Sequence, residues 1–79
     1  MPKKVLIYTT PVCVYCRMVK SFFNARGISY EERDVMENER TRAEMFEKSG
    51  STVVPVIDVD GEIFVGYHRD ALMELFREA

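Results

Sequence analysis

The Cys-x-x-Cys segment at residues 13–16 constrains the fold more than any other part of the chain, because a predicted strand and a predicted helix meet there. Residues 4–8 are apolar, β-branched and aromatic, which predicts a buried strand that residues 9–11 bring to an end. Apolar residues then recur at helical spacing and predict a helix that begins at Cys13, with Cys16 one turn further on the same face. The apolar residues of this helix are Val14, Met18, Val19, Phe22 and Phe23.

This placement of the two cysteines predicts redox chemistry. A cysteine reacts as its thiolate, and the unpaired N–H groups and positive dipole end of a helix N-terminus stabilise that anion. Cys13 has this position, and Arg17 and Lys20 follow it in the same helix. Cys16 lies inside the first turn, where it is less exposed and is placed to attack a disulfide formed by Cys13. The pair is therefore predicted to be a nucleophile with its resolving partner.

Two other interpretations of the cysteine pair have to be weighed. The thiols are half of a four-ligand zinc site, but the chain has no second pair of cysteines, and His68 is its only histidine. A structural disulfide is disfavoured, because so short a loop removes little entropy from the unfolded chain. The alternative function is therefore a metal or iron–sulfur cluster carrier that bridges a dimer through Cys13 and Cys16.

The size and composition of the chain argue against several classes of protein. Its 79 residues, 47% of them hydrophobic, predict one domain over residues 1–79 with a core of its own. Both cysteines belong to the motif, which argues against a secreted disulfide scaffold. The apolar run after residues 1–4 is too short for a signal peptide, and no stretch approaches the roughly 20 apolar residues of a membrane span. We expect a cytoplasmic monomer that does not associate with membranes.

Charge is distributed unevenly along the chain. The net charge is −2, yet residues 1–26 carry five bases and no acid, while the remainder carries 13 acids and six bases. The basic half contains the predicted nucleophile, where it favours a thiolate and attracts acidic partner surfaces. The chain has no basic stripe with interleaved aromatic residues, so nucleic-acid binding is not expected.

The middle of the chain predicts a βαβ unit followed by a helix. Gly27 is expected to end the first helix, and residues 28–35 follow as a second strand, parallel to the first and at the edge of the sheet. Residues 36–49 predict a surface helix with Asn38 as its cap and Gly50 as its stop. Its narrow packed face would consist of Ala43, Met45 and Phe46.

The last third predicts a hairpin and a short helix. Residues 51–59 have the composition of a strand that Pro55 interrupts, and a cis Val54–Pro55 bond is one way to fit proline there. Asp60-Gly61 predicts a two-residue turn into a strand over residues 62–65. His68 is expected to begin a final helix, rather than to bind metal or act as a base. The apolar residues of that helix are Ala71, Leu72, Leu75 and Phe76.

The order βαβ-α-ββ-α resembles the thioredoxin fold in its minimal α/β form, a four-stranded mixed sheet flanked by three helices. More closely, the chain is similar to the glutaredoxins over almost its whole length. The resemblance rests on residues 8–16, on Val53-Val54-Pro55 and on Val65-Gly66-Tyr67. It implies a dithiol–disulfide oxidoreductase without a bound cofactor, which reduces protein disulfides or glutathione mixed disulfides.

The resemblance also implies a substrate site around Cys13. In the family the proline of the V-P step is cis and lies beside the cysteines, so Pro55 would face Cys13 and the Val54 backbone would pair with substrate. The other residues expected to bind substrate are Tyr15, Gly66, Tyr67 and Asp70. We also expect an apolar collar around Cys13 for docking a protein segment, formed by Val12, Val14, Val53, Val54 and Tyr67, although packing in the core is an equal alternative for Val53.

Departures from the glutathione-using members concern the electron donor. Thr10 replaces a usual lysine, Thr52 stands where a basic residue is common, and His68 follows Gly66-Tyr67 where a Gly-Gly run and an aspartate are usual. Val14 after the first cysteine resembles the glutaredoxin-like redoxins of the NrdH type, which thioredoxin reductase reduces, although these usually carry a basic residue at position 10. Glutathione and thioredoxin reductase are therefore both candidate donors, and ribonucleotide reductase is one candidate disulfide substrate.

Overall fold

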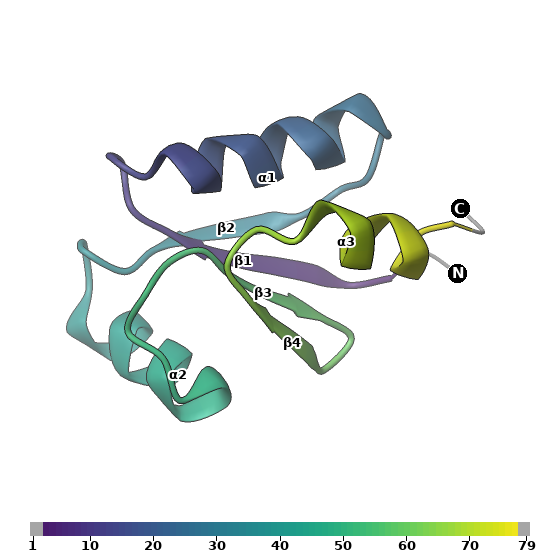
Figure 1. Cartoon of the computed structure of the whole chain (residues 1–79). Helices are drawn as coiled ribbons and strands as arrows, with labels where there is room; N and C mark the ends of the chain where they lie inside the picture. Colours follow the sequence, from purple (N-terminus) through teal and green to yellow (C-terminus); the bar gives the residue numbers. More distant parts are fainter. Residues whose placement is uncertain (1–2, 78–79) are drawn as a thin grey trace.

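The computed structural model describes residues 3–77, which form strands and helices in the predicted order (Figure 1). The elements are β1 (Val5–Thr9), α1 (Val14–Ala25), β2 (Glu31–Asp34), α2 (Glu39–Ser49), β3 (Val56–Val59), β4 (Glu62–Val65) and α3 (Arg69–Leu75). None of the helices in this described part of the chain has the length and apolar character needed to cross a bilayer. The βαβ-α-ββ-α order is confirmed.

The four strands form one mixed sheet in the order β2-β1-β3-β4. β1 pairs with β2 in parallel and with β3 in antiparallel orientation, and β3 continues into antiparallel β4. In this register Ile7 lies opposite Glu32 on one side and Ile57 on the other. The predicted edge position of β2 is confirmed, and β1 is a central strand whose five residues are all buried.

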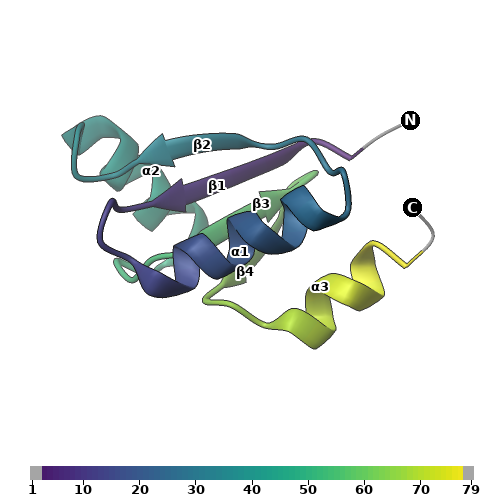
Figure 2. The same cartoon turned by 90° about the horizontal axis from the view of Figure 1, so that it is seen from above.

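Helices cover both faces of the sheet. α1 and α3 lie on one face and α2 on the other, as Figures 1 and 2 show. Side chains alternate along β1, so Val5 and Ile7 belong to the cluster under α1 and α3, while Leu6 and Tyr8 belong to the cluster over α2. One strand thus anchors both layers of the molecule.

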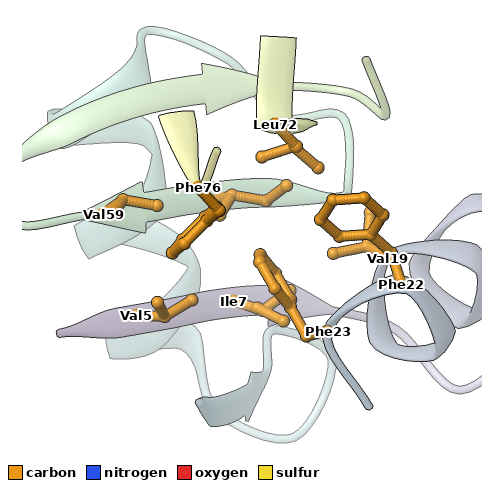
Figure 3. Close-up of a cluster of buried hydrophobic side chains, with 9 residues drawn as sticks. Val5, Ile7, Val19, Phe22, Phe23, Val59, Leu72 and Phe76 are labelled. Carbon is orange, nitrogen blue, oxygen red and sulfur yellow. The ribbon is translucent and has the colours of Figure 1, made fainter. Parts of the chain in front are cut away.

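The cluster under α1 and α3 is the larger of the two, and aromatic rings occupy its centre (Figure 3). Phe23 is fully buried and meets Phe22 and Phe76 edge-to-face, with both ring centroids 5.5 Å from its own. This packing fixes α1 on the sheet and thereby fixes the position of the cysteines at its start. The buried members are Val5, Ile7, Val19, Phe22, Phe23, Ile57, Val59, Leu72 and Phe76.

Local sequence signals account for the helix ends and the hairpin. Asn38 caps α2 by accepting a hydrogen bond from the Arg40 N–H at 2.8 Å, and Gly50 ends it in the left-handed conformation, with φ 69°. Asp60 and Gly61 both have positive φ, as a two-residue hairpin turn between twisted strands requires. These predicted caps and the predicted turn are confirmed.

The predicted second strand is too long. β2 begins at Glu31, because the preceding apolar residues Ile28 and Tyr30 pack their side chains against the larger core cluster instead of extending the sheet. In α2 only Met45 is buried, whereas Ala43 and Phe46 are exposed, so the predicted three-residue packed face is wrong.

The segment before Pro55 is also not the predicted strand. Residues 51–54 form a loop that leads to a cis Val54–Pro55 bond, and β3 begins only at Val56. Serine side chains bind the backbone there: Ser49 Oγ accepts from the Ser51 N–H at 3.0 Å, and Ser51 Oγ accepts from the Val53 N–H at 3.0 Å. These local bonds replace those of a strand ladder.

Candidate active site

Cys13 is the N-cap of α1, as predicted. Its backbone is extended, and its Sγ accepts a hydrogen bond from the Cys16 N–H at 3.1 Å. The Cys13 carbonyl oxygen in turn accepts the Arg17 N–H at 3.3 Å, which begins the helical hydrogen-bond pattern. The half-buried sulfur thus receives a donor that a thiolate binds more strongly than a thiol does.

Cys16 has a different environment, although it lies only one turn away. Its side chain is 1% exposed. Burial is the largest cause of a pKa raised to about 12, the hydrogen bond with Cys13 adds to it, and Thr10 and Lys20 act in the opposite direction. At neutral pH Cys16 is therefore a protonated thiol, which must lose its proton before it can attack a disulfide.

A charged pair lies behind the buried thiol. Lys20, one turn after Cys16, places its Nζ 2.9 Å from Glu32 Oε2 on β2, and the buried Thr9 hydroxyl donates to the same oxygen at 2.8 Å. The hydrogen bond with Glu32 raises the pKa of Lys20, and the same bond lowers the pKa of Glu32. The sequence indicated Lys20 as a base that follows Cys13 in the same helix, but nothing in it identified Glu32 as its partner.

The loop before β3 forms the second wall of the site. The Val54 carbonyl oxygen lies 3.9 Å from Cys13 Sγ, and Pro55, after the cis bond, is buried. The Gly66 N–H donates to the Pro55 carbonyl at 2.8 Å, which joins the end of β4 to this wall. Gly66 has a φ of 86°, a conformation that glycine adopts without strain. The structure therefore brings Cys13, Cys16, Val54, Pro55 and Gly66 together.

Three other residues predicted to bind substrate are exposed or half-buried. Tyr15 is 60% exposed on the first turn of α1, Tyr67 is half-buried against the larger core cluster, and Asp70 is exposed on the first turn of α3. Within residues 3–77, no hydrogen bond or ion pair joins these side chains to either cysteine. Their roles in binding stay predictions.

The apolar side chains predicted to surround Cys13 are all at least partly exposed. Val12, Val14 and Val53 are 84%, 66% and 64% exposed, whereas Val54 and Tyr67 are half-buried. The alternative position of Val53 in the core is therefore wrong. Exposed apolar side chains grouped around a reactive group are typical of a surface that contacts another molecule.

Among residues 3–77, the histidine and the acidic residues add no metal site to the cysteines. No group of three or more His, Cys, Asp or Glu side chains in the described part of the chain is arranged to hold a metal ion. His68 begins α3, and its Nε2 lies 2.8 Å from the Val65 carbonyl oxygen, so its ring closes the β4–α3 connection.

Comparison with known proteins agrees with this geometry. The Glutaredoxin family model matches residues 5–65. An uncharacterized glutaredoxin-like 8.6 kDa protein in the rubredoxin operon of Clostridium pasteurianum is 32% identical over 72 residues, which are 91% of this chain and 96% of that protein. Glutaredoxin 3 of Escherichia coli K12 is 38% identical over 56 residues, 71% of this chain and 68% of that one. The crystal structure of the thioredoxin-like protein BC3987 superposes with a TM-score of 0.86 at 32% identity, over 91% of this chain and 99% of that one.

The fold and the paired cysteines define a thiol–disulfide oxidoreductase with a thioredoxin-like fold. The chain belongs to the glutaredoxin family, and Cys13 and Cys16 are its Cys-x-x-Cys pair. Membership in this family implies disulfide substrates and a glutathione-linked redox system.

Proposed function

We propose that Cys13 is the nucleophile of this oxidoreductase and that Cys16 resolves the intermediate. The observation that carries this assignment is the contrast between the two thiols. Cys13 is partly exposed and accepts a backbone hydrogen bond, whereas Cys16 is buried with a pKa of about 12. Only the Cys13 sulfur is accessible to a substrate sulfur at neutral pH.

The reaction proceeds by two exchanges. The Cys13 thiolate attacks one sulfur of the substrate disulfide, the substrate S–S bond breaks, and the second substrate sulfur leaves as a thiolate and takes up a proton. Cys16 then loses its proton and attacks Cys13 Sγ, which releases the first substrate sulfur as a thiol and leaves Cys13–Cys16 oxidised. Two electrons thus pass from the chain to the substrate, one proton comes from Cys16, and the other comes from the solvent, which took it up when Cys13 ionised.

The walls around Cys13 are the proposed binding site for the substrate chain. A peptide-like substrate would pair with the backbone of Val54, and the Val54 carbonyl oxygen, 3.9 Å from Cys13 Sγ, supports this role. The hydrogen bond from the Gly66 N–H to the Pro55 carbonyl oxygen holds this wall together. The rim residues of the proposed site are Tyr15, Tyr67 and Asp70.

The proposed electron donor is thioredoxin reductase, as for redoxins of the NrdH type. The support is that uncharged residues, Thr10 and Thr52, replace the charged residues with which glutathione-using relatives bind glutathione. The neighbouring Ser51 hydroxyl accepts a hydrogen bond from the Val53 N–H of its own loop. We further propose a single domain over residues 1–79 that acts as a cytoplasmic monomer, with ribonucleotide reductase among its candidate substrates.

The donor is tested by following NADPH consumption with the oxidised chain in two reactions. One contains glutathione and glutathione reductase, and the other contains thioredoxin reductase. Turnover only with thioredoxin reductase is the expected result. Efficient turnover with glutathione would refute the proposed donor while leaving the cysteine chemistry intact.

The roles of the cysteines are tested by two serine variants. Cys13→Ser should abolish exchange completely, because no other accessible thiol exists in the chain. Cys16→Ser should retain the first exchange and accumulate a mixed disulfide, visible by mass spectrometry. Retained exchange in Cys13→Ser would overturn the assignment.

A further inference from the structure

A groove of about 340 Å³ runs between α1 and the start of α3, beside the cysteine site. Met18, Phe22 and Arg26 line it from α1, and Tyr67 and Arg69 line it from the β4–α3 connection and the start of α3. α1 and α3 lie side by side on the same face of the sheet in Figure 2. Apart from Tyr67, which is a rim residue of the proposed binding site, the oxidoreductase chemistry described above does not use the residues of this groove.

The charge of the groove is uniformly positive. Arg26 and Arg69 are its only ionisable basic residues, and no acid lines it. Within residues 3–77 neither guanidinium pairs with a carboxylate, and that of Arg26 lies 4.9 Å above the centre of the Phe22 ring. In the groove of similar volume over α2, by contrast, lysines and an arginine face four carboxylates. Among the residues that the structure describes, no carboxylate thus compensates the positive charge beside α1.

The floor of the groove is apolar, and Met18 and Tyr67 in it lie within two residues of Cys16 and Gly66 in the sequence. Met18 is 42% exposed and lies five residues after Cys13 in the same helical region. Tyr67 follows Gly66, whose N–H binds the carbonyl of Pro55 beside Cys13. A chain bound at Cys13 can therefore continue into the groove without leaving the surface.

We propose that this groove binds an acidic, extended segment of the protein that exchanges disulfides with Cys13. The proposal rests on the function proposed above. Carboxylates of the segment pair with Arg26 and Arg69, and an apolar side chain between them covers Met18 and Tyr67. α1 rises about 1.5 Å per residue, so Arg26 lies about 20 Å along the helix from Cys13. An extended segment covers that distance in about six residues, so the acids would lie up to about six residues from the reacting cysteine of the partner.

The test uses synthetic peptides with one cysteine joined by a disulfide to thionitrobenzoate. The Cys13 thiolate attacks the peptide sulfur, the S–S bond breaks, and thionitrobenzoate leaves as a coloured thiolate whose release is followed by stopped flow. One peptide carries glutamates four to six residues from its cysteine and another carries glutamines there. Each is made with these residues before or after the cysteine. Glutathione joined to thionitrobenzoate serves as a small anionic comparison.

Two double variants with the same change in charge are compared. Arg26→Glu with Arg69→Glu reverses the groove, and Arg40→Glu with Arg42→Glu makes the same change at exposed arginines on α2. Arg26→Gln with Arg69→Gln removes the charge without adding acids, and it replaces the first pair if that does not fold. Folding of each variant is checked by circular dichroism.

The acidic peptide should react about three- to tenfold faster than the neutral one at low salt, as expected for two exposed ion pairs. This ratio should fall to one in the glutamine variant, fall below one in the Arg26 and Arg69 glutamate variant, and persist in the α2 variant. High salt should bring it toward one, because it screens exposed charges.

Equal rates for the two peptides in the unmodified protein would overturn the proposal. An equal fall of the acidic-to-neutral rate ratio in both glutamate variants would also overturn it, because it would indicate attraction by net charge alone. An equal fall in the rate of the glutathione disulfide would overturn it too, because it would indicate a glutathione site. In all three cases the neutral peptide still reacts through Cys13, so the proposed function stands. If no peptide reacts, the proposed function fails, and the groove proposal fails with it.

Discussion

The two faces of the sheet are built from different materials. Under α1 and α3, nine buried apolar residues form a continuous core with Phe23 at its centre. Over α2, five buried residues form a smaller cluster that charged side chains complete. There the Tyr8 hydroxyl donates to Glu44, Arg33 pairs with the same carboxylate at 2.6 Å, and Lys48 pairs with Asp58 at 2.9 Å.

The two faces therefore differ in how their stability depends on pH. Apolar packing has no titrating group, so the core that holds α1 on the sheet does not itself depend on pH, although the Lys20–Glu32 pair near Cys16 does. The face that carries α2 obtains part of its stability from ionised groups, which makes that part dependent on pH. β1 contributes alternate residues to both faces, so the pH-independent and the pH-dependent contacts share one strand.

The largest expected effect comes from truncating the centre of the apolar face. Phe23→Ala should lower the free energy of unfolding by about 3–5 kcal/mol, because it removes a fully buried ring and leaves a cavity. Met45→Ala on the α2 face should cost about 2–3 kcal/mol, at the low end for buried methionine, because the smaller cluster can relax. Urea unfolding measures both values. A larger loss for Met45→Ala would reverse the comparison.

A smaller, pH-dependent effect is expected on the α2 face. The hydrogen bond from Tyr8, with the charge of Arg33, holds the pKa of Glu44 below its ordinary value of 4.5. A lowered pKa contributes stability that is present above about pH 4.5 and is lost as the pH falls through the folded-state pKa. Glu44→Gln should therefore destabilise the protein at pH 7 by up to about 1 kcal/mol, since this pair is more than one third exposed.

The measurement is urea unfolding of the protein and of Glu44→Gln between pH 7 and pH 3. The difference between them should shrink toward the acidic end. The lowered pKa values of Glu32 and Asp58 act equally in both proteins and cancel. A difference that stays constant with pH would show that the carboxylate charge contributes nothing.

Two matched lysines give the smallest and sharpest test. Lys20 and Lys48 are 29% and 33% exposed, and each lies 2.9 Å from a carboxylate, but only Lys20 lowers the pKa of Cys16. Lys20→Met should raise that pKa further and slow the resolving step about threefold at neutral pH, the factor expected for one charge at a distance of a few ångströms near water. Lys48→Met should leave this step unchanged. The release of peptide thiol from the Cys13 mixed disulfide, followed against pH, distinguishes the two, and equal rates in both variants would contradict the role of Lys20.

Features that depend on neighbours in the sequence could be predicted well. The start of α1 at Cys13, the cap at Asn38 and the turn at Asp60-Gly61 each follow from a few adjacent residues, and all are present. The fold class came from the resemblance of the element order to the thioredoxin fold, and that order is confirmed. The proximity of Cys13 to Val54 came from resemblance to a family, since no local pattern joins residues 41 positions apart.

Features that depend on competing contacts could not be predicted. Residues 51–54 have the composition of a strand, but the hydroxyl groups of Ser49 and Ser51 bind the backbone there. No sequence pattern shows whether these hydrogen bonds or strand pairing will be the more stable. The Lys20–Glu32 pair and the groove with Arg26 and Arg69 join different elements. Such contacts become visible only when the elements have been placed in space.

The sulfur that caps α1 is also the atom that reacts. Each time Cys13 enters a disulfide, the helix exchanges a strong acceptor for a weak one at its first turn, so the folded dithiol and the folded disulfide cannot be equally stable. By a thermodynamic cycle, the difference between their unfolding free energies equals the shift in reduction potential that folding imposes on the two cysteines. Denaturant titrations of the two forms, made without any substrate, would therefore measure how far folding shifts the reduction potential of the cysteine pair from its value in the unfolded chain.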